Sequence, residues 1–169
     1  MAGLVRVGIV SDTHSHWDEE VEAFFADCAE LWHAGDIGSL EVLDRMRAFR
    51  PVRAVWGNID DAAMRREVPQ EQDFTLAGLR VYMRHIGGYP GRYAPGVRRR
   101  LLELRPDLFI AGHSHILKVL HDELLGLLHI NPGAYGREGF HTLRTAVRLE
   151  LAGGKPVGLE LLRLPRHGK

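Results

Sequence analysis

The stretch LVRVGIVSDTH at residues 4–14 decides the fold of this chain. Its first seven residues are mostly aliphatic and predict a buried β-strand. Asp12 and His14 follow at once, so two polar side chains stand where the strand should end. The same arrangement recurs in four further clusters, each directly after a short apolar run: Gly35-Asp36, Gly57-Asn58, His85 and Gly112-His113-Ser114-His115. Five clusters in one structural context indicate a shared site, which one cluster alone would not.

The first half of the chain alternates predicted strands and helices. We expect strands over residues 4–10, 30–34 and 51–56. Asp18 and Ser39 can each cap a helix. The spacing of the apolar residues gives each helix one buried face: Val21, Phe24, Phe25 and Cys28 in the first, and Leu40, Leu43, Met46 and Phe49 in the second. An alternating order of this kind predicts parallel strands joined by right-handed crossovers.

The second half is richer in strands. Strands over residues 79–83 and 107–111 should be separated by a loop and by a helix that begins at Pro95. Residues 117–120 and 124–130 should form a hairpin across Asp122-Glu123. Residues 143–151 alternate apolar and polar side chains, and Gly153-Gly154 predicts a turn into a last strand at residues 157–164. We therefore predict one domain over residues 1–169, an α/β protein of two packed mixed β-sheets flanked by helices.

The composition limits the functions to consider. The chain of 169 residues contains 22 basic and 22 acidic side chains, and this balance argues against nucleic-acid or membrane binding driven by bulk charge. Cys28 is the only cysteine, which excludes an internal disulfide and fits a reducing cytoplasm. The N-terminus does not read as a signal peptide, and no apolar stretch is long enough to span a bilayer. We expect a soluble cytoplasmic protein without a membrane partner.

The five clusters carry the side chains of a metal site. In parallel sheets, ligands bind beyond the carboxyl ends of the strands, so the clusters should meet there. Imidazole ligands shift the preference from magnesium or calcium towards manganese, iron, cobalt, nickel or zinc. The candidate ligands exceed what one ion with an open position needs, so we predict two divalent ions. These ligands are Asp12, His14, Asp36, Asn58, His85, His113 and His115.

A pair of ions points to one reaction type. Asp36 is the natural carboxylate to bridge them. Two ions about 3.5–4 Å apart can clamp a phosphoryl group and acidify a bridging water, and the resulting hydroxide would attack phosphorus in line. Because that water must lose a proton, activity should rise from acidic towards mildly alkaline pH. The sequence therefore predicts metal-assisted hydrolysis of a phosphate ester.

The order of these motifs resembles that of the calcineurin-like metallophosphoesterases. The shared pattern is Asp-x-His, Gly-Asp, Gly-Asn, a lone strand-end histidine and Gly-His-x-His. Gly57-Asn58-Ile59-Asp60 and Asn131-Pro132-Gly133 are similar to the small prokaryotic phosphodiesterase branch. The resemblance implies a four-layer αββα sandwich and a dinuclear centre. It further implies two ligand sets: Asp12, His14, Asp36 and His115 for one metal, and Asp36, Asn58, His85 and His113 for the other.

One departure from the family pattern concerns the leaving group. Larger relatives have a histidine after the Gly-Asn asparagine, which is thought to assist the transition state or the leaving group. Here the residue is Ile59, and Asp60 is the nearest replacement. Asp36, Asn58 and Asp60 are therefore our candidate catalytic residues. His85 also lacks the second histidine that many relatives have two residues later, although it can still bind a metal.

The loop at residues 87–93 leaves two interpretations open. It is either a glycine-rich surface loop, or it places Tyr89, Arg92 or Tyr93 over the metals to bind substrate. In the second case an arginine could hold a phosphate oxygen.

Several other residues have ordinary structural interpretations. We expect His33 in the core and His16 exposed, and we expect Asn131 to shape a turn. His129 could approach the site. Exposed Trp17 and Phe140 could mark a contact between subunits of a homo-oligomer.

The sequence thus predicts a metal-dependent phosphoesterase that acts on a small phosphate ester, and the resemblance favours a diester. Manganese is our first choice of metal. Two alternatives stay open. A protein-binding scaffold on the same fold has a precedent in the retromer subunit that shares this architecture, although all seven ligand positions are filled here. A nuclease is disfavoured by the neutral charge and the short length.

Overall fold

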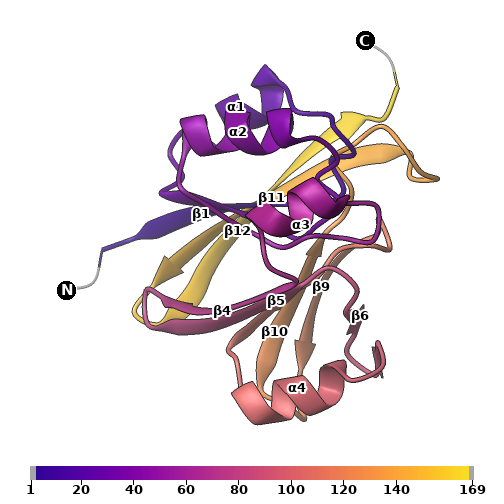
Figure 1. Cartoon of the computed structure of the whole chain (residues 1–169). Coiled ribbons are helices and arrows are strands. Elements are labelled where there is room, and N and C mark those ends of the chain that lie inside the picture. Colours follow the sequence, from indigo (N-terminus) through magenta and orange to yellow (C-terminus); the bar gives the residue numbers. More distant parts are fainter. Residues whose placement is uncertain (1–2, 168–169) are drawn as a thin grey trace.

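Two five-stranded β-sheets pack face to face in the computed structural model, which describes residues 3–167 (Figure 1). The strands of the first sheet are β1 (Val5–Val10), β2 (Glu30–His33), β3 (Val52–Ala54), β11 (Leu143–Ala152) and β12 (Lys155–Pro165). Their order across the sheet is β12-β11-β1-β2-β3. The strands β1, β2 and β3 are parallel, as the alternation with helices predicts, and β11 and β12 continue the sheet in antiparallel fashion.

The second sheet repeats this plan. Its strands are β4 (Glu71–Leu76), β5 (Leu79–Arg84), β8 (Leu108–Ile110), β9 (Leu117–Asp122) and β10 (Leu127–Pro132), in the order β4-β5-β8-β10-β9. The inner strands β5, β8 and β10 are parallel, and the two outer strands are antiparallel to their neighbours. Each sheet is therefore mixed, and each has a group of parallel strands whose carboxyl ends lie at one edge.

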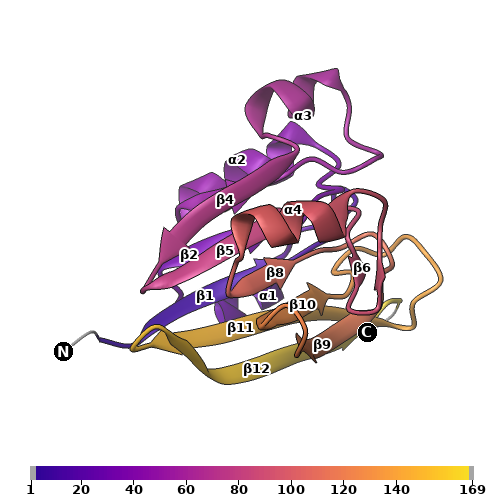
Figure 2. The same cartoon turned by 90° about the horizontal axis from the view of Figure 1, so that it is seen from below.

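Helices cover the outer faces of both sheets (Figures 1 and 2). They are α1 (Glu19–Phe24), α2 (Leu40–Phe49), α3 (Ala62–Glu67) and α4 (Val97–Leu104). Side chains of the first three helices share a buried cluster with the first sheet, whereas α4 packs on the second sheet. No helix within residues 3–167 is long and apolar enough to cross a membrane.

A third apolar cluster fills the space between the sheets. Val7, Ile9 and Trp32 from the first sheet meet Met83 and Ile110 from the second, and all five are fully buried. The molecule is thus a four-layer αββα sandwich, and the predicted fold class is confirmed. The predicted helix caps are also present, since Asp18 and Ser39 accept hydrogen bonds from the backbone N–H groups of Val21 and Val42.

Three local features differ from the sequence prediction. Residues 62–67 and 71–76 had no predicted element, yet they form α3 and β4. The turn of the second-sheet hairpin is not at Asp122-Glu123 but at residues 123–126, because the Asp122 carboxylate accepts hydrogen bonds from the N–H groups of Leu124 and Leu125. The predicted loop at residues 86–96 contains a short hairpin of β6 (Gly88–Tyr89) and β7 (Arg92–Tyr93).

Two residues expected at the surface are more buried than predicted. Trp17 is only 7% exposed, because its indole packs near Phe25 and Tyr135 and donates a hydrogen bond to Glu22 Oε1. His16 is half-buried, with Nε2 at 2.9 Å from Asp18 Oδ2. Trp17 therefore cannot mark a subunit contact, whereas Phe140 is fully exposed as expected.

Candidate metal centre

All seven predicted ligands lie just past the carboxyl ends of parallel strands. Those from the first sheet are Asp12 and His14 after β1, Asp36 after β2 and Asn58 after β3. Those from the second sheet are His85 after β5, and His113 and His115 after β8. Both sheets thus direct their ligand-bearing loops to one edge, the place where parallel sheets bind their ligands.

The backbone at these positions is strained. Within residues 3–167, eight residues other than glycine have a positive φ, and five of them are predicted ligands: Asp12 (53°), His14 (43°), Asp36 (58°), His113 (73°) and His115 (61°). A left-handed backbone costs such a residue about 1–2 kcal/mol. Strain of this kind persists where the surrounding structure enforces it, and it clusters at functional sites.

The glycines of the motifs allow the loops to approach one another closely. A Cβ atom on Gly35 would lie 2.6 Å from Nδ1 of His85. A Cβ atom on Gly57 would overlap the carboxylate of Asp36, and one on Gly112 would overlap the hydroxyl of Ser11. These three positions therefore admit only hydrogen, because neighbouring loops bring ligand side chains against the backbone.

Asp12, His14 and His115 form the first group of ligand atoms. Asp12 Oδ1 lies 3.2 Å from His115 Nε2 and 3.9 Å from His14 Nε2. The other carboxylate oxygen of Asp12 accepts hydrogen bonds from Ser11 Oγ at 2.6 Å and from the backbone N–H of His113 at 3.0 Å. These two bonds hold the carboxylate so that Oδ1 faces the histidines.

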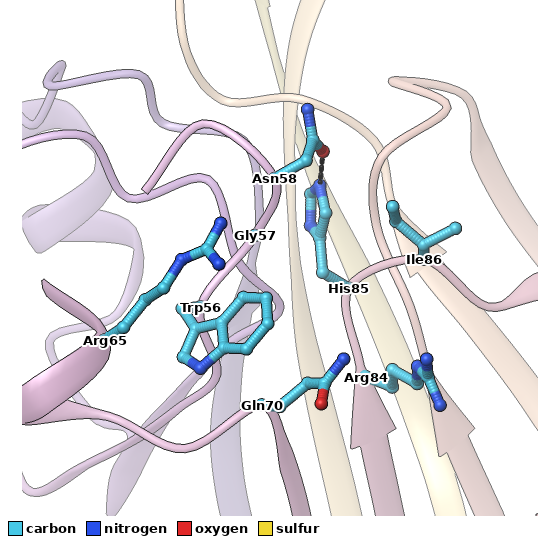
Figure 3. Close-up of a pocket in the computed structure, with 8 residues that line it drawn as sticks. All are labelled: Trp56, Gly57, Asn58, Arg65, Gln70, Arg84, His85 and Ile86. Atoms are coloured by element: carbon cyan, nitrogen blue, oxygen red, sulfur yellow. Dashed lines mark hydrogen bonds between the residues drawn. The ribbon is translucent and has the colours of Figure 1, made fainter. Parts of the chain in front are cut away.

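Asp36, His85, Asn58 and His113 form the second group. Asp36 Oδ2 lies 3.3 Å from His85 Nε2, and Asn58 Oδ1 lies 3.1 Å from the same nitrogen (Figure 3). Asn58 Oδ1 is also 3.0 Å from His113 Nδ1. On its far side, His85 donates a hydrogen bond from Nδ1 to the carbonyl of Ala34 at 2.7 Å. In the neutral ring that bond keeps the proton on Nδ1, so Nε2 has a lone pair for a cation at the centre.

The residues fit a pair of divalent cations. Asp12 Oδ1 and His14 Nε2 are buried, and neither has a hydrogen-bond partner within residues 3–167. A buried polar atom without a partner is destabilising, and a cation would satisfy both. Two groups of three side chains place their ligand atoms close enough together to hold an ion each. One group is Asp12, His14 and His115, and the other is Asp12, Asp36 and His85.

Asp36 also stands between the two predicted ligand sets. Its Oδ2 lies 3.5 Å from His14 Nε2, in addition to its contact with His85. Asp12 Oδ1 likewise lies 3.8 Å from His85 Nε2, so each of the two carboxylates is close to histidines of both sets. Bridging by Asp36 stays a prediction, because Asp12 has the same reach.

The charges of the centre favour a cation between the carboxylates. Burial alone would raise the pKa of Asp36, but a protonated His85 ring, which can donate from Nε2 and carries a positive charge, holds that pKa below its ordinary value. Burial alone would lower the pKa of His85, but Asp36 and Asp12 raise it. The carboxylates thus stabilise positive charge where the two ligand groups meet.

A buried histidine supports the loops from behind. His33 lies in the core as predicted, and burial lowers its pKa to about 4. The neutral ring accepts a hydrogen bond from the N–H of Gly35 at Nδ1, and its Nε2 lies 3.0 Å from the hydroxyl of Thr13. His33 therefore ties the loop after β1 to the loop after β2.

The position of Asp60 argues against the proton-donor role that we considered. Its buried carboxylate accepts hydrogen bonds from three backbone N–H groups, those of Ile37 (3.2 Å), Gly38 (2.9 Å) and Gly57 (2.8 Å). These bonds tie the loop that carries Asp36 to the loop that carries Asn58. We therefore correct our expectation: Asp60 positions other residues and does not face a substrate.

In the loop at residues 87–93, some of the candidate substrate-binding residues lie near the metal centre and one does not. Tyr89 and Arg92 line a hollow beside His113, together with Lys118. Lys118 Nζ lies 3.2 Å from the centre of the Tyr89 ring. Tyr93 instead donates a hydrogen bond to Asp122 at 2.6 Å and packs on Phe109. The substrate-binding expectation thus needs correction for Tyr93, whereas Tyr89 and Arg92 stay candidates.

Sequence reasoning missed His141 at this site. It lies in the long loop before β11, and its Nδ1 is 3.3 Å from Nδ1 of His115. No sequence spacing relates His141 to another candidate ligand, so only the fold brings it to the centre.

His129 points away from the centre and donates a hydrogen bond to the carbonyl of Phe109 at 3.0 Å. Asn131 shapes the turn at Gly133, as we expected.

An αββα sandwich with carboxylate and imidazole side chains gathered at the carboxyl edge of both sheets is the arrangement expected of a metallophosphoesterase. Comparison with known families agrees. Residues 5–154 match the calcineurin-like phosphoesterase superfamily domain. The chain belongs to this superfamily, as the order of its motifs implied.

Individual relatives support the same placement. The chain is 33% identical over 135 residues to a probable metallophosphoesterase of Methanothermobacter thermautotrophicus, and the match covers 76% of each protein. It is 28% identical over 141 residues to a probable metallophosphoesterase of Methanocaldococcus jannaschii, covering 79% of this chain and 70% of that protein. The structure of Vacuolar Protein Sorting 29 from Cryptosporidium parvum has the same fold, with a TM-score of 0.73 and 17% identity over 96% of this chain and 98% of that chain.

Proposed function

We propose that this protein is a phosphodiesterase that uses two divalent metal ions, with manganese as our first choice. The main support is the convergence of the ligand atoms: Asp12, Asp36 and Asn58 each lie within 3.3 Å of a ligand histidine. Asn58 and His113 are exposed, so the centre is open and suits a small phosphate ester. The preference for a diester rests on the motifs of the small prokaryotic branch.

Each of the two ligand sets would bind one ion. Asp12, His14, Asp36 and His115 would hold one, and Asp36, Asn58, His85 and His113 the other. Ions bound there would neutralise the charge of the phosphate and make a water acidic enough to act as a nucleophile near neutral pH. Ser11, Asp60 and His33 would hold the ligand loops in place through the hydrogen bonds described above.

Asn58 and Arg92 are suited to contact the substrate. The carbonyl oxygen of Asn58 faces two histidines, and its amide nitrogen donates no hydrogen bond within residues 3–167. That nitrogen can therefore donate to a phosphoryl oxygen. Arg92 and Lys118 line the adjacent hollow and can pair with a second oxygen.

The leaving group receives little help from this chain. Ile59 is 46% exposed at the position of the family's histidine, and Asp60 is committed to three backbone N–H groups. Esters whose leaving group is a stable anion should therefore react fastest. This reasoning favours aryl diesters over dialkyl diesters as test substrates.

A protein-binding scaffold is the second candidate. The likeness in fold to Vacuolar Protein Sorting 29 favours it, and so does the fully exposed Phe140 beside His141 and Ile116. The complete set of ligand side chains favours hydrolysis. The two candidates differ in whether Asp36 and His85 matter for turnover.

The test combines metal content with hydrolysis. Purified protein should contain or take up about two ions per chain, a pair being what such a reaction uses. With manganese it should cleave bis(p-nitrophenyl) phosphate faster than p-nitrophenyl phosphate, and it should leave single-stranded DNA intact. Asp36→Asn and His85→Ala should lose most of this activity while they stay folded by circular dichroism.

Matched controls come from the surface. Asp44→Asn on α2 and His121→Ala on β9 change exposed residues of the same types and should retain activity. Full activity in either Asp36→Asn or His85→Ala would remove that residue from the mechanism. A metal-loaded protein that cleaves no ester would favour the scaffold.

A further inference from the structure

A notch beside the metal centre carries side chains that the proposed reaction does not use (Figure 3). Two of its lining residues, Asn58 and His85, are predicted ligands. The others come from the loop after β3, from α3, from the segment before β4 and from β5 and the loop after it: Trp56, Gly57, Arg65, Gln70, Arg84 and Ile86. The notch therefore opens directly onto the ligand side chains.

The notch is cationic. None of its lining residues, all within the described part of the chain, is acidic. Arg65 donates from Nε to the carbonyl of Asp60 at 2.8 Å, and its two terminal nitrogens, which make no hydrogen bond within residues 3–167, can donate to a ligand. Glu71 is the neighbour of Arg84 on the adjacent strand. Its carboxylate accepts hydrogen bonds from Arg100 at 2.8 Å and from the Tyr82 hydroxyl at 2.6 Å, so it is already engaged by other side chains.

Trp56 gives the notch an aromatic wall. The guanidinium of Arg65 lies 4.1 Å from the centre of the indole, and this contact holds the ring in one orientation. The indole is half-buried, because it also packs against the cluster beneath the first sheet. Trp56 and the guanidinium stacked on it thus form a fixed, partly exposed wall beside the predicted ligands, whereas Trp17 and Trp32 are buried.

The size of the notch limits its occupant. It encloses about 180 Å³, which is less than the roughly 300–1,000 Å³ of pockets that hold a whole drug-sized ligand. It suits one flat group attached to a phosphate that lies outside it. Gln70 offers both an amide donor and a carbonyl acceptor, and Arg84 offers further donors.

We propose that the notch binds the base of a nucleotide ester whose phosphate lies at the metal centre. The base would stack on the wall formed by Trp56 and the Arg65 guanidinium that covers it, and its ring nitrogens and exocyclic groups would pair with Gln70 and Arg84. A plain phenyl ring would bury these polar groups without partners, which is unfavourable. The assignment builds on the proposed function, since it names the class of substrate for the same site.

Binding to the manganese-loaded full-length protein tests the assignment without relying on turnover. Titration calorimetry should compare adenosine 5′-monophosphate with ribose 5-phosphate, which has the same sugar and phosphate but no base. The nucleotide should bind about tenfold more tightly or better, the usual size of a base-stacking effect. Trp56→Ala should abolish the difference between the two ligands, and Arg84→Gln should reduce it.

Two further variants keep the test interpretable. Trp56→Phe retains an aromatic surface and should keep part of the difference, even if Trp56→Ala is poorly folded. Arg99→Gln on α4 removes an arginine that is 87% exposed and pairs with Glu103, so it should change nothing. Phenyl phosphate, as a simple aryl ligand, should bind no better than ribose 5-phosphate.

Several outcomes would overturn the assignment. Equal binding of the nucleotide and ribose 5-phosphate would refute a base site, and so would an unchanged difference in both Trp56→Ala and Arg84→Gln. Phenyl phosphate that binds as well as the nucleotide would refute a nucleobase. Hydrolysis of bis(p-nitrophenyl) phosphate, measured separately, distinguishes failure of this site from failure of the proposed reaction.

Discussion

His141 should set the metal affinity of the centre although it is not itself a predicted ligand. Its Nε2 lies 2.8 Å from the carbonyl of Gly136, and a carbonyl only accepts, so this nitrogen carries the proton. Burial lowers the pKa of His141, which keeps the ring neutral near pH 7 and leaves Nδ1 as an acceptor. The partner nitrogen, Nδ1 of His115, must then be the donor. The free lone pair of His115 is consequently on Nε2, which faces Asp12 at 3.2 Å.

The substitution His141→Phe removes the acceptor and keeps a planar aromatic ring at this position. Loss of an outer partner of a ligand histidine typically weakens metal binding by about 10–100-fold. The 3.3 Å contact is longer than an ideal hydrogen bond, and His141 is only half-buried. We therefore expect the lower end, about tenfold or about 1.4 kcal/mol. The free energy of unfolding of the metal-free protein should hardly change.

The assay is competition for manganese or zinc against a calibrated chelator, with thermal unfolding in the presence and absence of metal as a second measurement. His121→Phe on β9 is the matched control, because His121 is exposed and lies within a strand, outside the loops that carry the predicted ligands. His115→Ala gives the full effect of losing the ligand. The reasoning fails if His141→Phe binds metal within twofold of the wild type while His115→Ala loses it.

Three other substitutions test separate features of the structure. Burial lowers the pKa of His129 to about 4, against about 6.5 in the unfolded chain. The unfolded state therefore binds a proton first as the pH falls from 6.5 to 4, and stability is lost across that window. His129→Leu should flatten this loss, by about 2 kcal/mol between pH 7 and pH 5, in urea unfolding with chelator at these two pH values; an unchanged slope would contradict it. Gly57→Ala should abolish metal uptake and lower the free energy of unfolding, because its methyl group would overlap the carboxylate of Asp36 and also its backbone nitrogen; normal metal content would exclude the close approach. Ala77→Gly should raise the free energy of unfolding by about 1 kcal/mol, since Ala77 has a φ of 51° in the β4–β5 turn, and a loss of stability would show that this turn is not strained.

The convergence of the candidate ligands could be predicted from sequence because each carries a local signal. A polar residue after an apolar run and next to glycine is visible without knowledge of the fold, as at Gly35-Asp36 and Gly57-Asn58. Parallel strands then bring such positions to one edge whatever their separation in sequence. The fold class followed from the same alternation of strands and helices.

The parts that sequence missed lack a periodic signal. Met64 is the only buried residue of α3, so the helix shows no apolar stripe, although Asp61 caps it by accepting a hydrogen bond from the N–H of Met64. None of the residues of β4 is fully buried, so that strand shows no apolar run. The sequence also did not show where individual side chains point. Tyr93 points to Asp122 because the hairpin of β6 and β7 orients it in that direction.

The backbone strain of the ligand loops is opposed by hydrogen bonds between these loops. Five left-handed ligand residues represent about 5 kcal/mol of conformational strain at about 1 kcal/mol each, against the 5–15 kcal/mol of net stability that is usual for a domain. Backbone hydrogen bonds between the loops oppose this strain: Asp12 N to Gly35 O at 2.9 Å, His14 N to Asp36 O at 3.1 Å and Gly136 N to Asp12 O at 2.9 Å. Each of these bonds involves a predicted ligand residue and joins it to a neighbouring loop. The centre is therefore held by mutual contacts among its loops, and a bound cation would add to the same set of restraints by satisfying Asp12 Oδ1 and His14 Nε2.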